Sequence, residues 1–138
     1  MVRIGGVFGF IGLTCILFLA TRPVLLAVVG KYRKSGKTLP DLLKKVFQFV
    51  TKYHRYVGLT AVGAIVIHFF LQFRQYGYIP PAGLTAGLLL VTQAVLGLGM
   101  TKQKDKERRK KMASLHRILG ILLVTAVLVH RTIGYLTK

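Results

Sequence analysis

The chain has 138 residues, of which 53% are hydrophobic, and its mean hydropathy is +0.55. Its 21 Lys and Arg residues against three acidic residues give a formal net charge of +18. The basic residues lie between long apolar runs, which is typical of contact with anionic membrane lipid and argues against nucleic-acid binding. With Cys15 as the single cysteine, the chain has neither an intrachain disulfide nor a C-x-x-C-H motif for covalent haem attachment.

Four long apolar runs without acidic residues dominate the sequence, over residues 4–20, 56–73, 80–100 and 118–130. With its flanks, each run approaches or exceeds the roughly 20 residues that a helix needs to cross a bilayer. The runs show none of the polar faces, repeating with the helical period, that a soluble bundle would have. We therefore expect an all-α membrane protein, with a single domain over residues 1–138 that forms a four-transmembrane-helix bundle.

The first predicted helix covers about residues 4–29. It resembles a signal peptide, but it is long and has no clear small-x-small cleavage site, so we expect it to be retained. Pro23 should kink this helix or start a short continuation. After a basic loop, Pro40 and Asp41 mark the next helix start. Residues 41–53 interleave apolar residues with lysines, as in a short amphipathic helix that lies at the membrane surface.

The other three predicted transmembrane helices cover about residues 54–73, 81–100 and 112–135. The third contains Gly83-x-x-x-Gly87, a pattern of small residues that lets neighbouring helices approach closely. The loop before it carries tyrosines at the depth expected for the membrane interface.

The distribution of basic residues predicts the orientation in the membrane. The loop between the first and second helices and the loop between the third and fourth each hold eight Lys and Arg residues when Arg55 and Arg117 are included, against four on the opposite side. The positive-inside rule then places the loops 31–53 and 101–115 in the cytoplasm and both termini outside. We expect the membrane to be a prokaryotic cytoplasmic membrane.

The second and fourth helices carry all four histidines, which are His54, His68, His116 and His130. Each helix has the spacing H-x13-H. Fourteen residues turn a helix by about 1400°, close to four full turns, so the two histidines share one face and stand roughly 21 Å apart along the axis. Because the second and fourth helices run in the same direction, His54 should be level with His116, and His68 with His130.

Two imidazoles at one level can bind a haem b iron from opposite faces of the macrocycle, and bundle cores commonly hold cofactors. Intramembrane ionisable residues are costly and usually functional. We therefore expect two non-covalent haems b, with His54 and His116 as ligands of the inner iron and His68 and His130 as ligands of the outer iron. Zinc or copper would also accept imidazole, but two histidines per level make a poor zinc site.

Other residues are candidates for contacts with these haems. Gly58 and Gly120 each follow a histidine by four residues on the same helix face, where a missing side chain lets the porphyrin edge approach. Helix packing is an equally good reading of these glycines. The candidate partners of the anionic propionates are arginines near the histidines, namely Arg55, Arg117, Arg74 and Arg131. Each of these arginines taken singly is better explained as a topology anchor.

The histidine segments also resemble each other and a known group of proteins. Residues 54–68 and 116–130 both read H-R-x-x-G-x9-H, at an offset of 62 residues. At these residues the chain resembles the di-haem membrane cytochrome b group, meaning cytochrome b561-like proteins and the ferric reductase-like transmembrane domain, over roughly residues 50–135. The resemblance implies electron transfer across the membrane through two bis-histidine haems, often with a quinol as one partner. The chain departs from the pattern in having four helices and no flavin or nicotinamide domain.

We expect transmembrane electron transfer by a cytochrome b relay subunit rather than by a self-sufficient enzyme, because two six-coordinate irons leave no open site for a substrate. The partners would be a quinone in the bilayer, or a redox protein or subunit at the basic cytoplasmic face. One alternative is a stand-alone quinone oxidoreductase, whose pocket would use Gln93, Gln72 or Arg22. The other is a haem-free membrane anchor or assembly protein whose histidines only pack.

Overall fold

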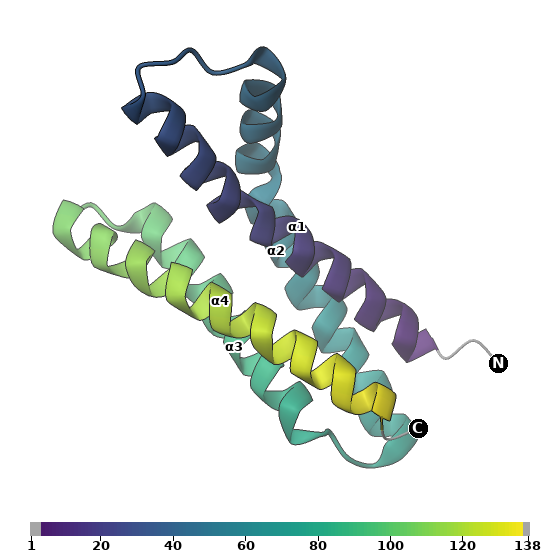
Figure 1. Ribbon diagram of the computed structural model, residues 1–138. Helices are drawn as coiled ribbons and strands as arrows, with labels where there is room; N and C mark the ends of the chain where they lie inside the picture. Colours follow the sequence, from purple (N-terminus) through teal and green to yellow (C-terminus); the bar gives the residue numbers. More distant parts are fainter. Residues whose placement is uncertain (1–3, 137–138) are drawn as a thin grey trace.

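The computed structural model of the protein describes residues 4–136, and the regular structure in this range is entirely α-helical. Four helices follow one another along the chain (Figure 1): α1 (Ile4–Lys34), α2 (Asp41–Tyr76), α3 (Pro81–Lys102) and α4 (Lys106–Leu136). Each of them is long and apolar enough to cross a membrane. The expected all-α architecture with four such helices is therefore confirmed.

The helices extend further than the apolar runs that predicted them. α1 continues through Pro23 to Lys34, and α4 begins at Lys106 within the basic loop. Residues 41–53 are helical, and they run without a break into the second apolar run as part of α2. The reason is that residues 41–57 contain neither glycine nor proline, and lysine is a good helix former. Their expected position at the membrane surface stays a prediction.

Local signals set the helix ends inside the loops. Gly77 ends α2 in the left-handed conformation, with φ of 72°, and its N–H donates to the carbonyl of Phe73 at 2.8 Å. Proline at the first position of α3 fits the helix start, where no N–H is needed. Asp105 caps α4, because its Oδ1 accepts hydrogen bonds from the backbone N–H groups of Glu107 (2.8 Å) and Arg108 (3.2 Å).

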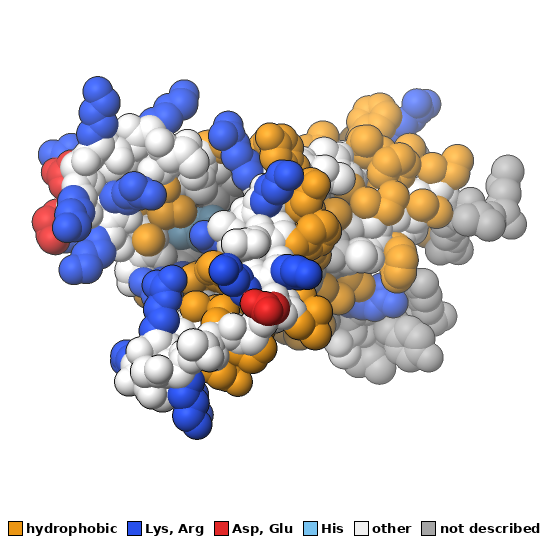
Figure 2. Space-filling model, turned by 90° about the horizontal axis from the view of Figure 1, so that it is seen from above, with side chains coloured by type: hydrophobic (Ala, Val, Ile, Leu, Met, Phe, Trp, Pro, Cys, Tyr) orange, Lys and Arg blue, Asp and Glu red, His pale blue; other side chains and the backbone are white. Residues whose placement is uncertain are grey.

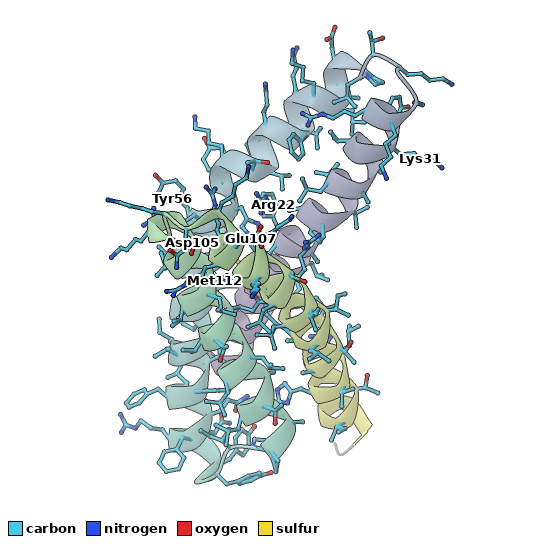
Figure 3. All side chains as sticks on the ribbon, turned by 90° about the vertical axis from the view of Figure 1, so that its left-hand side faces the viewer. Arg22, Lys31, Tyr56, Asp105, Glu107 and Met112 are labelled. Carbon is cyan, nitrogen blue, oxygen red and sulfur yellow. The ribbon has the colours of Figure 1, made fainter. Side chains whose placement is uncertain are left out.

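The four helices form two antiparallel hairpins. α1 packs mainly against α2, and α3 packs mainly against α4, with fewer contacts between the hairpins. Figures 1 and 3 show the hairpins side by side at one end and diverging toward the end that carries the turn between α1 and α2. Within the described residues, no Cα atom of α2 comes within 8 Å of a Cα atom of α4. The backbones of α2 and α4, the two helices that bear histidines, are therefore not in contact with each other.

One packed layer lies in the middle of this bundle. It consists of one buried residue from each helix, namely Ile16, Ala61, Leu90 and Leu123. Ala61 is seven residues from both histidines of α2, and Leu123 is seven residues from both histidines of α4. The layer therefore separates an inner histidine level, near the two basic loops, from an outer one.

Candidate functional site: two histidine levels between α2 and α4

His54 of α2 and His116 of α4 form the inner pair. Their ring centroids are 6.4 Å apart, with an angle of 67° between the ring planes. Both side chains are half-buried, and the Nδ1 atoms of both are buried without a hydrogen-bond partner. The sequence-based pairing of these two histidines across the bundle is therefore seen in the structure.

The spacing of the inner rings fits two ligands of one metal. A metal–imidazole nitrogen bond is about 2.0–2.1 Å long, so two imidazoles on opposite sides of one ion have centroids roughly 6–6.5 Å apart. The ring planes are free to differ in angle, because each can rotate about its own metal–nitrogen bond. The observed 6.4 Å separation lies within this range.

Two further polar side chains lie at the inner level. Gln93 of α3 is 6% exposed, and its Nε2 donates to the backbone carbonyl of His116 at 2.7 Å, while its Oε1 is buried without a partner. Arg22 of α1 lies within electrostatic range of both inner histidines, and its Nε is also buried without a partner. Figure 3 shows Arg22 close to where the hairpins begin to separate. Unpartnered buried groups of this kind are rare in proteins, so the inner level is the unusual part of the described bundle.

His68 of α2 and His130 of α4 belong to the outer level, where they lie near enough to interact electrostatically. Nδ1 of His68 is 2.7 Å from the carbonyl oxygen of Gly5 in α1. Because a carbonyl only accepts hydrogen bonds, this Nδ1 carries the proton, and Nε2 is left with a free lone pair. Metal-binding histidines typically have this arrangement, in which the second nitrogen donates to a carbonyl.

Glycines of α1 and α3 lie against three of the four imidazoles, and two of them, Gly9 and Gly83, leave less space than an ordinary β-carbon contact needs. A β-carbon added to Gly9 would lie 3.0 Å from Cε1 of His68, and one added to Gly83 would lie 2.9 Å from Cε1 of His130. A β-carbon added to Gly97 would lie 3.5 Å from Cε1 of His116. These glycines are not among the residues expected from the sequence to contact the histidines. The signal was present, because Gly83 and Gly97 are fourteen residues apart, like the histidines that they face in the antiparallel α4.

The two glycines that were expected to admit a porphyrin edge differ from each other. A β-carbon on Gly58 would meet nothing within 4 Å, so the surface beside His54 is open. A β-carbon on Gly120 would lie 3.0 Å from Nε2 of Gln93, so the space beside Gly120 is taken by that amide. A porphyrin contact at Gly58 therefore stays a prediction, whereas Gly120 serves the packing of Gln93.

The four arginines proposed as propionate partners are all exposed. Nε of Arg117 donates to the carbonyl of Ala113 in its own helix at 3.3 Å, and the guanidinium of Arg74 lies 5.9 Å from the centre of the Phe70 ring. Arg55 and Arg131 point to the surface at the inner and outer ends. Arg22, which the sequence analysis considered only for a quinone pocket, is the arginine with a buried nitrogen near a histidine pair.

The residues proposed for a quinone pocket lie at two different levels. Gln93 and Arg22 both belong to the inner level, as described above. Gln72 is at the other end, where its side chain packs near Gly5 of α1. A separate cavity of about 240 Å³ between α2 and α3 is lined by nonpolar residues such as Val62, Phe69 and Leu88 and by no histidine. This cavity offers no polar group to a redox cofactor.

The number of metal-ligating side chains at each level limits which groups could bind there. Within residues 4–136, no three His, Cys, Asp or Glu side chains come together in a way that could hold a metal ion. A metal bound by two imidazoles at one level would therefore take its remaining ligands from a cofactor, such as the four nitrogens of a haem macrocycle. The 6.4 Å separation of the inner rings fits such a group, and the buried Nε of Arg22 is a donor that an anionic propionate could accept from.

Both basic loops lie on the same side of the middle layer as His54 and His116, although the hairpins diverge there (Figures 1 and 3). Figure 2 looks onto the molecule from above and shows Lys and Arg side chains around a hollow in which pale-blue histidine atoms are visible. The inner histidine level is therefore close to a strongly basic surface.

Comparison of the chain with protein-family models, with curated proteins and with solved structures finds no match.

Proposed function

We propose that the protein is a di-haem membrane cytochrome b that transfers electrons across a membrane. The observation that carries the proposal is the inner pair: two histidines from different apolar helices face each other at 6.4 Å, although burying unpaired imidazoles in a membrane is costly. When bound, two haems b would supply one-electron carriers at two depths of the membrane.

The chain's own residues would hold and orient these groups. His54 and His116 would bind the inner iron, and His68 and His130 the outer iron. The hydrogen bond from His68 to the Gly5 carbonyl fixes which nitrogen of the ring is available. The middle layer of the bundle keeps the two levels apart.

The basic end of the bundle supports a relay function with a partner. Sixteen Lys and Arg residues belong to the two loops at this end when Arg55 and Arg117 are included. Figure 2 shows many Lys and Arg side chains on this side of the molecule. A redox protein or subunit with an acidic surface would be attracted to this end and guided by long-range electrostatics. We place this end in the cytoplasm by the positive-inside rule.

The spectrum of the purified protein tests the proposal directly. A reduced-minus-oxidised difference spectrum of the detergent-purified protein should show the bands of b-type haem. The His54→Ala/His68→Ala double variant should be purified in parallel and should lack these bands. A colourless wild-type protein would instead support a membrane anchor or assembly role.

One observation favours a second candidate, a quinone oxidoreductase. Nε of Arg22 needs an acceptor, and Gln93 is close to the same histidine pair, so together they resemble the polar side of a quinone pocket. Reduction of the purified protein by a short-chain quinol measures this activity. Reduction that Gln93→Leu abolishes would favour the quinone enzyme, whereas reduction by small soluble reductants alone would favour the relay.

A further inference from the structure

The two histidine levels differ in their polar surroundings. At the outer level, Nδ1 of His68 is 2.7 Å from the Gly5 carbonyl. At the inner level, the Nδ1 atoms of both histidines have no partner within the described residues. Arg22 of α1, whose Nε is buried, lies where the hairpins begin to separate (Figure 3). These differences act on the reduction potential of any metal held at each level.

We propose that the inner level has the higher reduction potential of the two, and that Arg22 is the positioning residue that raises it. This inference rests on the proposed function. Reduction lowers the positive charge of an iron centre by one. A fixed positive charge in a half-buried site therefore stabilises the reduced state, and it does so more strongly than in water because the local dielectric constant is low.

The hydrogen bond at the outer level acts in the opposite direction. A histidine that donates its second N–H to a carbonyl becomes a more basic ligand, which stabilises the oxidised metal. His68 makes this bond to Gly5, whereas neither inner histidine makes one through Nδ1. Both differences therefore lower the outer potential relative to the inner one.

The positive charges of the basic loops also favour a higher reduction potential at the inner level. The basic loops lie at the inner end, although solvent and salt screen their exposed charges. Arg22 differs from them because its Nε is buried. A single electron placed on the protein should therefore reside mainly at the inner level, so the favoured direction of transfer between the levels is from the outer end toward the basic end.

Potentiometric titration of the purified protein, followed by visible absorbance, tests this order. The wild type should titrate in two steps. The higher step should be missing in His116→Ala and retained in His68→Ala. Arg22→Gln should lower the higher step by an amount that corresponds to about a tenfold change in equilibrium constant, or about 59 mV for one electron, and should leave the lower step in place.

Two control variants separate charge from packing. Arg22→Lys keeps the charge and should keep the higher step near its wild-type potential. Arg33→Gln removes an exposed charge from the same helix and should move either step by less than a third of the Arg22→Gln shift.

The inference would be overturned if His116→Ala retained the higher step. It would also be overturned if Arg22→Gln shifted both steps equally or shifted neither step. In each of these cases, two titration steps in the wild-type protein would still support the proposed function. A protein that shows no haem bands at all would contradict both.

Discussion

The imidazole of His130 occupies the space above Gly83: its Cε1 atom is 2.9 Å from where a β-carbon on that glycine would lie. His68 has the same relationship with Gly9 at 3.0 Å. Each hairpin thus brings one outer histidine against a glycine of its neighbouring helix. This contact fixes how far each ring extends toward the centre of the bundle.

Gly83→Ala should therefore displace His130 and weaken the outer site. A β-carbon at 2.9 Å is closer than van der Waals contact permits, so the ring must move. We expect the haem content of purified Gly83→Ala to fall by up to half, with the remaining haem at the inner level. The measurement is the haem-to-protein ratio from absorbance.

Two other glycines serve as matched controls for this substitution. A β-carbon on Gly97 would lie 3.5 Å from His116, which is ordinary contact, and one on Gly134 would meet nothing within 4 Å. Gly97→Ala and Gly134→Ala should keep the wild-type haem content. Equal losses in all three variants would show that the effect is general destabilisation and not ring placement.

Single histidine variants should remove one level and leave the other. His68→Ala or His130→Ala should lower the haem per protein by about half, because the packed layer around Ala61 and Leu123 separates the levels. Full haem content in either variant would mean that the pairing by level is wrong. The variants should be compared at equal protein concentration after purification in the same detergent.

The middle layer should contribute strongly to stability. Leu123 is 5% exposed, and truncating a buried leucine to alanine typically costs about 2–5 kcal/mol, including the cavity left behind. Leu123→Ala should lower the thermal unfolding midpoint in detergent. Leu122→Ala is the control, because Leu122 is 49% exposed and on the bundle surface. Similar midpoints for both variants would argue against a packed layer in the middle of the bundle.

The orientation in the membrane can be tested by labelling single cysteines. In a Cys15→Ser background, Ser35→Cys places a thiol in the turn between α1 and α2, and Tyr78→Cys places one in the turn between α2 and α3. A membrane-impermeant thiol reagent added to intact cells should label Tyr78→Cys only, and Ser35→Cys should react after permeabilisation. The reverse pattern would invert the orientation expected from the positive-inside rule.

Much of the fold could be predicted from the sequence because membrane helices have a strong hydropathy signal. The helix ends could not, since basic segments such as residues 106–111 have little hydropathy but good helix propensity. Asp105 was the overlooked signal there, as its carboxylate caps α4. The same propensity explains why residues 41–53 continue into α2 rather than forming an element of their own.

Part of the candidate site could be predicted from the sequence in the same way, and part could not. The equal spacing of the histidines in α2 and α4 sufficed to predict that His54 would face His116, because both lie on one face of parallel helices. The positions of Arg22 and Gln93 depend on how α1 and α3 align with their neighbours. Hydropathy alone does not determine that alignment. The glycines opposite the histidines carry this information, since their spacing sets the antiparallel register of each hairpin.

The haem stoichiometry of wild-type protein purified in mild detergent tests the central claim most directly. The two histidine levels lead us to expect two non-covalent haems b per chain, with a ratio of one in any variant that lacks His68 or His130. A ratio of zero in protein that remains folded and monodisperse would contradict the account, and the histidines would then only pack.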